Sequence, residues 1–190
     1  SAKGGWAQAA ARRSGQASRR HRADSKRNVV VYSEADEPHI WPDVNDFVVA
    51  ETGDVVTALI PTDSFLYIAF RGSLYRFTFD LNPALDGSVH FFSARGCINQ
   101  RCWARLGDAL YIIDHLGIYK LEGGGVEDIS GSVHDLFTLQ IPGDWKVDWA
   151  ESQYAHAVAD QENNVVRFFA SLTGPTWPRH CIAYCPLNKQ

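Results

Sequence analysis

The chain has 190 residues, of which 45% are hydrophobic and 21% charged, and its formal net charge at pH 7 is −4. This length and composition suit one globular domain with a sizeable core, or a large part of one. No apolar run approaches the roughly 18 residues of a membrane span, and no cleavable signal pattern opens the chain, so neither membrane insertion nor secretion is indicated.

Residues 1–27 are predicted to form a basic arm in front of an acidic body. Residues 1–28 carry eight basic side chains and one acid, a charge of +7, which leaves −11 for the other 162 residues. Interleaved serine and glycine leave little apolar surface, so we expect an extended or partly helical arm that orders only against a partner. Clustered Arg and Lys suit nucleic acid or an acidic protein surface, and the alternative is a solvated, partly helical or disordered lead-in segment. The candidate contacts are Arg12, Arg13, Arg19, Arg20, Arg22, Lys26 and Arg27.

A strand is predicted over residues 28–34, and a loop rich in carboxylates follows it. Such loops can hold calcium, but the D-x-[DN]-x-[DN]-G order of a calcium loop is missing. We therefore expect a solvated or partner-facing loop. Its oxygen-bearing side chains are Glu34, Asp36, Glu37, Asp43, Asn45 and Asp46.

The stretch FLYIAFRGSLYRF, residues 65–77, alternates on both sides of Gly72 and predicts a β-hairpin. The stretch ALYIIDHLGIYKL, residues 109–121, repeats it at an offset of 44 residues. A weaker third copy, HAVADQENNVVRFF at residues 156–169, follows 47 residues later. His115 is at the tip of the second hairpin and is expected to be solvated. The glycine run at residues 123–125 is expected to be a turn and not a phosphate cradle.

Further short strands around these hairpins predict an all-β fold with four strands per unit. The units lie near residues 54–93, 98–130 and 133–186, and a period of 40 to 50 residues is typical of β-propeller blades. We therefore predict a propeller-type repeat region over residues 28–190, a partial ring of about three to four blades. Either the chain is a segment of a larger propeller or other chains complete the ring. The alternative is a β-sandwich or barrel whose hairpins resemble one another.

The search for catalytic chemistry is negative. The chain has no Walker loop, no G-x-S-x-G elbow and no H-E-x-x-H helix motif. Its seven histidines are scattered, without ligand spacing. Four thiolates could surround one zinc ion, but the C-x4-C and C-x3-C spacings favour small buried thiols at Cys97, Cys102, Cys181 and Cys185. No catalytic residue, cofactor or metal is predicted, and the chain is not expected to be an enzyme.

The tryptophans suggest an alternative function, which is glycan binding. The stretch SLTGPTW, residues 171–177, is similar to the Ser-x-Asp-x-Gly-x-Thr-Trp box of sialidases, but its Asp is absent and it is one residue short. Hydrolysis is therefore not predicted, although a propeller can bind glycans through exposed tryptophans. Trp145, Trp149 and Trp177 are candidates for a glycan site or for a protein interface.

The order of the motifs resembles the β-propeller structural proteins of tailed bacteriophages. The resemblance is carried by RNVVVYSEADEPHIWP, then GDVVTALIPTDSFLYIAFRGSLYRF, then GCINQRCWARLGDALYIIDHLGIYKLEGGGVEDIS. It covers residues 27–130, with a fainter echo in GPTWPRHCIAYCP at residues 174–186.

The resemblance implies a non-enzymatic virion protein that acts at the tail hub, at the nozzle or at the head-to-tail connection. It would be assembled in the cytoplasm of a bacterial host. The implied partners are portal, adaptor or tail subunits and further copies in a ring, with transient contact to genomic DNA and none to a membrane. The alternatives are a glycan-binding, receptor-binding propeller domain of a tail protein and a host-encoded scaffold propeller.

Overall fold

The computed structural model describes residues 28–33, 37–42, 46–49, 54–78, 88–138, 146–172 and 180–186. This part of the chain consists of antiparallel β-sheets with two short 3₁₀ helices, so the all-β prediction is confirmed. All seven candidate residues of the basic arm lie outside the described residues, as do Trp145 and Trp177. No helix in the described ranges is long and apolar enough to cross a membrane.

The strands form meanders in which each strand pairs with the next one along the chain. A two-stranded sheet contains β1 (Val29–Val31) and β2 (Asp46–Val48). The first sheet contains β3 (Ala58–Pro61), β4 (Phe65–Ala69), β5 (Leu74–Thr78) and β6 (Ser88–Ser93). The second sheet contains β7 (Trp103–Leu106), β8 (Ala109–Asp114), β9 (Gly117–Glu122) and β10 (Gly125–Asp128). The third sheet contains β11 (His156–Asp160), β12 (Val165–Ala170) and β13 (His180–Tyr184). The 3₁₀ helices η1 (Gly131–Leu136) and η2 (Trp149–Tyr154) lie between the second and third sheets in the chain.

The three predicted hairpins are confirmed as β4–β5, β8–β9 and β11–β12. The glycine run after β9 is also a turn, as predicted. Gly123 and Gly124 have φ values of 58° and 83° and form a two-residue connection to β10. Two-residue hairpin turns of type I′ need positive φ at both positions, and glycine adopts this conformation without a steric penalty.

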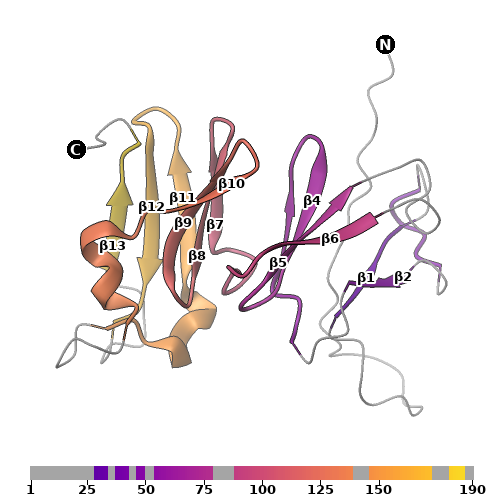
Figure 1. The fold of residues 1–190 in the computed structure, drawn as a ribbon, viewed down its shortest axis with the longest axis horizontal. Coiled ribbons are helices and arrows are strands. Elements are labelled where there is room, and N and C mark those ends of the chain that lie inside the picture. Colours follow the sequence, from indigo (N-terminus) through magenta and orange to yellow (C-terminus); the bar gives the residue numbers. More distant parts are fainter. Residues whose placement is uncertain are drawn as a thin grey trace.

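The sheets lie face to face in chain order, from β1–β2 at one end to β11–β13 at the other (Figure 1). The hairpin β8–β9 is buried along nearly its whole length, whereas the edge strand β10 is exposed throughout. One hydrophobic core lies among the first, second and third sheets. A smaller core joins β1–β2 to the first sheet, where the rings of Phe47 and Phe77 stack at 4.9 Å between centroids.

The first strands of successive sheets are joined through the segment that precedes β7. The side-chain amide of Gln100 forms two hydrogen bonds with the backbone of Leu59 in β3, at 2.8 and 3.0 Å. On the other side, the backbone N–H of Ala157 in β11 donates to the carbonyl of Arg101 at 2.7 Å. Strand β11 also lies beside β7. The segment therefore aligns the first strands of all three sheets.

Gly96 allows the link between the first and second sheets to pass against the β4–β5 turn. A Cβ atom at this position would overlap the carbonyl oxygens of Phe70 and Arg71. The neighbouring N–H of Cys97 donates to the carbonyl of Phe70 at 2.9 Å, which fixes the close approach. At Gly72, in the turn itself, a Cβ atom would meet no other atom within 4 Å.

We expect Gly96→Ala to lower the free energy of unfolding by about 1–3 kcal/mol, because backbone atoms cannot yield as a flexible side chain can. The matched control is Gly72→Ala, which should change stability by less than about 0.5 kcal/mol. Urea denaturation of both variants measures the difference. Equal stability of the two variants would contradict the packing described for Gly96.

Candidate functional site

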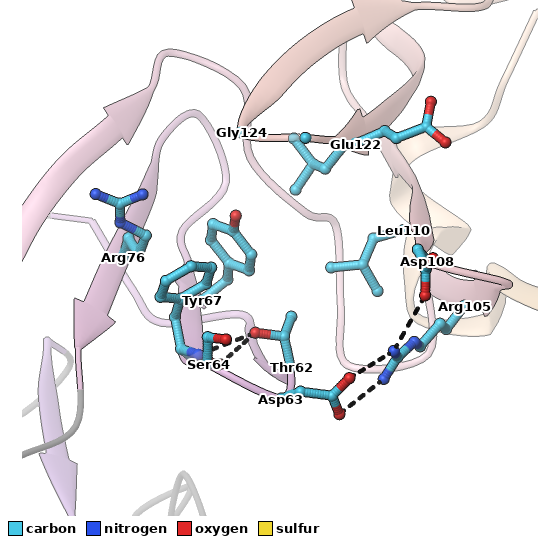
Figure 2. Close-up of a pocket in the computed structure, with 13 residues that line it drawn as sticks. Thr62, Asp63, Ser64, Tyr67, Arg76, Arg105, Asp108, Leu110, Glu122 and Gly124 are labelled. Carbon is cyan, nitrogen blue, oxygen red and sulfur yellow. Dashed lines mark hydrogen bonds and ion pairs between the residues drawn. The ribbon is translucent and has the colours of Figure 1, made fainter.

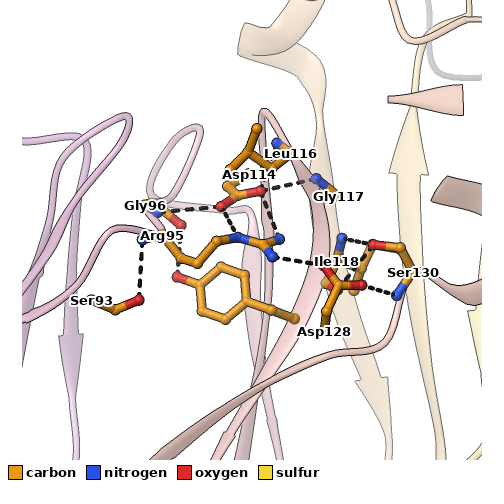
Figure 3. Close-up of polar contacts among 10 residues, drawn as sticks. Ser93, Arg95, Gly96, Asp114, Leu116, Gly117, Ile118, Asp128 and Ser130 are labelled. Carbon is orange, nitrogen blue, oxygen red and sulfur yellow. Dashed lines mark hydrogen bonds and ion pairs between the residues drawn. The ribbon is translucent and has the colours of Figure 1, made fainter. Parts of the chain in front are cut away.

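Arg95 forms the polar junction between the first and second sheets (Figure 3). It lies on the link between β6 and β7, and its guanidinium reaches the turn and the edge of the second sheet. Its Nε donates to Oδ2 of Asp114 at 2.6 Å and its Nη2 to Oδ1 at 3.0 Å. Its Nη1 donates to Oδ2 of Asp128 at 2.7 Å. The guanidinium also lies 4.7 Å from the ring centroid of Tyr119, a favourable cation–π distance.

The buried side chain of Asp114, only 2% exposed, has several hydrogen-bond donors around it. It accepts from the backbone N–H groups of Leu116 and Gly117 at 2.8 and 3.0 Å, and from that of Gly96 at 3.3 Å. A buried charge is tolerated when it is paired and hydrogen-bonded in this way. The carboxylate thereby holds the β8–β9 turn and the incoming link together.

At this junction, burial and hydrogen bonding shift the pKa values of the charged groups in opposite directions. Burial disfavours the charged form of Arg95, but the hydrogen bonds that Arg95 donates to Asp114 and Asp128 outweigh it, so the pKa of Arg95 is raised. Burial likewise opposes ionisation of Asp128, but the hydrogen bonds from Arg95 and Ser130 leave its pKa below the usual value. Burial raises the pKa of Tyr119 well above its usual value, and its hydroxyl donates to the carbonyl of Gly96 at 2.7 Å. At neutral pH, Arg95 and Asp128 are therefore charged and the hydroxyl of Tyr119 keeps its proton.

A pocket of about 450 Å³ opens between the first and second sheets (Figure 2). One wall carries Phe65, Tyr67 and Arg76 from β4 and β5. The opposite wall carries Leu110 and Leu121 from β8 and β9. Its volume lies within the range of small-molecule sites, and it combines apolar walls with a few polar groups.

An ion pair borders one end of this pocket. Nη2 of Arg105 lies 2.9 Å from Oδ2 of Asp63, and its hydrogen bond and charge lower the pKa of Asp63. Asp108 lies 4.0 Å from the same guanidinium nitrogen. Arg105 is thus already neutralised by acids of the pocket rim, as the dashed lines in Figure 2 show.

The third sheet has one covered face and one open face. On β12, Val166, Phe168 and Ala170 belong to the core, so the alternate residues Val165, Arg167 and Phe169 lie on the other face. The cross-strand register places Val158, which is 48% exposed, beside Arg167 on this open face. No other sheet of the described ranges covers it.

Trp149 is the candidate glycan or interface residue that the structure describes. It is half-buried at the start of η2, packs on the core, and lies 4.6 Å from the ring of His115 and 6.2 Å from that of Phe137. The expectation of a solvated turn holds for Leu116 at the tip, which is 56% exposed, but the ring of His115 is partly buried. Trp149 packs against this ring, and burial lowers the pKa of His115.

The four cysteines do not form one cluster. Cys97 and Cys102 are buried, and their thiols donate to the carbonyls of Asn99 and Ala155 at 3.1 and 3.2 Å. Burial raises the pKa of Cys97 well above its usual value and that of Cys102 to about 12. Cys181 is exposed on β13. Within the described residues, no three His, Cys, Asp or Glu side chains are placed to hold a metal ion.

The residues of the junction and the pocket were not selected from the sequence. The sequence contains a signal for Asp114: at the offset of 44 residues, this charged residue occupies the position of the apolar Phe70 in the first hairpin. Arg95 lies outside the repeated hairpins, so a comparison of the three copies does not single it out. A scan against family models finds no match for the chain, and a search of curated proteins finds none either.

We expect Asp114→Ala to lower the free energy of unfolding by about 3 kcal/mol, because it leaves Arg95 without its main partner and several N–H groups without an acceptor. Asp63→Ala is the matched control, since it removes the aspartate of an exposed Arg–Asp pair and should leave stability nearly unchanged. Thermal and urea unfolding compare them. A loss of similar size in both variants would show that burial of the junction is unimportant.

Proposed function

We propose that the chain is a non-enzymatic structural protein of a tailed-bacteriophage virion, acting at the tail hub, the nozzle or the head-to-tail connection. The resemblance of residues 27–130 to phage propeller proteins is one support for this proposal. The other is the arrangement of the sheets, in which consecutive meanders stack face to face. The mechanism is mechanical: rigid sheets hold loops against neighbouring subunits.

In this proposal the sheets are propeller blades. Three observations support this assignment. Two consecutive meanders have four strands each, their first strands are aligned, and the last strand β10 is exposed. A blade has a first strand toward the axis and a last strand toward solvent, and each blade covers the face of its neighbour. The junction at Arg95 would then fix the angle between two blades.

The observation that carries the proposal is the open face of the third sheet. We define the forward face of a sheet as the face that the next sheet along the chain covers. The forward face of the first sheet carries Tyr67 and Arg76. The forward face of the second sheet carries Tyr111, whose ring centroid lies 5.7 Å from that of Tyr184 in the third sheet. Val158 and Arg167 occupy the equivalent positions of the third sheet, where the face is open.

The repeat of one stacking interface favours another sheet of the same kind as the occupant of this face. A second copy of the chain can supply that sheet, and repetition of one such contact generates a ring of copies when the rotation closes. A ring around the tail axis suits this geometry. The acidic body would repel DNA that passes through the ring, since like charges repel.

We expect the phage that encodes this chain to form particles without functional tails when its gene is deleted. Complementation with the Val158→Asp variant should fail, because a charge on the open face prevents stacking of the next sheet. The control Val126→Asp places the same charge on the exposed edge strand β10 and should restore infectious particles. Electron microscopy and plaque counts read the result. Normal tails without the gene, or full rescue by Val158→Asp, would contradict the proposal.

The basic arm is proposed to dock on a portal, adaptor or tail subunit, with transient contact to genomic DNA. Its charge of +7 supports this role, because basic clusters bind acidic surfaces and phosphates. We expect a chain without residues 1–26 to reduce particle assembly or DNA retention in the same complementation assay. Unchanged assembly and unchanged DNA content in the particles would rule out this role of the arm.

A further inference from the structure

Three equivalent strand positions carry a cation, and they differ in how that cation is paired. Arg76 on β5, Lys120 on β9 and Arg167 on β12 follow the repeat offsets of 44 and 47 residues. Each faces an equivalent cross-strand neighbour, respectively Tyr67, Tyr111 and Val158. The three cations therefore occupy the same place on the forward face of their sheets.

Two of these cations are neutralised within their own sheet. Nζ of Lys120 lies 2.5 Å from Oε2 of Glu122, and Nη1 of Arg167 lies 2.6 Å from Oδ2 of Asp160. The hydrogen bond from Arg167 is the main cause that lowers the pKa of Asp160 to about 2. Both pairs use a carboxylate on the same or the neighbouring strand.

Arg76 has no such carboxylate. Thr78 occupies the position that Glu122 has in the second sheet, and Ala69 the position that Asp160 has in the third. No ion pair to Arg76 is found among the described residues. Its guanidinium instead lies 5.0 Å from the ring centroid of Phe65 and 5.8 Å from that of Phe92.

The buried Nε of Arg76 also has no hydrogen-bond partner among the described residues. A partly buried guanidinium that meets only aromatic rings is electrostatically unsatisfied, because cation–π contacts are weaker than a bidentate carboxylate pair. The position is therefore suited to an external anion.

Arg76 lines the pocket between the first and second sheets, so an anion that enters this pocket can reach it. The three acids that line the pocket are paired with other cations: Asp63 and Asp108 lie beside Arg105 at one end, and Glu122 pairs with Lys120. In Figure 2 the carboxylate of Glu122 points away from Arg76. Burial raises the pKa of Tyr67, so its hydroxyl is protonated at neutral pH and can donate to a ligand beside Arg76.

We propose that this pocket binds a carboxylate-bearing sugar, whose carboxylate pairs with Arg76 and whose ring packs against Tyr67. The aromatic and leucine walls suit the C–H faces of a sugar ring, and the polar rim at Thr62 and Ser64 suits its hydroxyl groups. The volume of about 450 Å³ accommodates a monosaccharide or a disaccharide. This binding does not depend on the proposed virion function.

Titration of the protein with glucuronate, glucose and acetate at equal ionic strength tests the ligand class. Saturation-transfer NMR should detect saturable binding of glucuronate, with glucose and acetate at least about tenfold weaker, because each lacks one half of the recognised group. Acetate binding as tight as glucuronate binding would indicate a simple anion site and overturn the sugar assignment. Equal binding of glucose, or absence of glucuronate binding, would overturn the proposal as well.

Variants test the role of Arg76 within the same pocket. Arg76→Gln should weaken glucuronate binding at least about tenfold, because a charge-assisted hydrogen-bond pair is lost. The matched control Arg105→Gln removes the arginine that Asp63 already neutralises and should change the affinity by less than about twofold.

Thr78→Glu keeps Arg76 but supplies the carboxylate that the second sheet has at Glu122. It should weaken glucuronate binding as much as Arg76→Gln does, and its exposed position should leave the fold intact, which thermal unfolding checks. Wild-type affinity in Thr78→Glu, or an equal loss in Arg105→Gln and Arg76→Gln, would overturn the proposed role of Arg76.

Discussion

The burial of the β8–β9 hairpin on both of its faces is the constraint on which the rest of the structure depends. An antiparallel sheet usually keeps one face in water, but every residue of β8 is buried. The second sheet therefore requires a neighbour on each side, and the first and third sheets supply them. At the open end of the stack, β12 instead alternates between buried and partly exposed residues. The stacking of sheets is thus the source of stability, and a single sheet would leave its apolar faces in water.

The polar junction at Arg95 gives this apolar stacking a defined geometry. Apolar contacts are not directional, so they do not by themselves fix how two sheets are rotated against each other. The bidentate contact of Arg95 with Asp114, together with the close approach at Gly96, holds the link at one position. The pocket lies at the other end of the same interface, and Arg76 lines it without a carboxylate partner of its own among the described residues.

The fold could be predicted further than the site could. The alternation around Gly72 and its repetition 44 residues later predicted the hairpins, because side-chain alternation and turn residues are local properties. The packing of Trp149 against His115 was not predicted, since the sequence contains no signal that η2 lies beside this hairpin tip. Asp114 and Arg95 are 19 residues apart in sequence, and nothing local in either one indicates the other.

The sequence alone determined the all-β class, the three hairpins and the places of their turns, because these follow from alternation and from glycine and asparagine at the connections. It also determined the contrast between a basic arm and an acidic body, which is a matter of composition. Only the tertiary structure decided which face of each sheet meets the next one, and hence that Lys120 and Arg167 are neutralised while Arg76 lies beside a pocket. The physical reason is that ion pairing depends on distances of a few ångströms, which folding sets and sequence spacing does not.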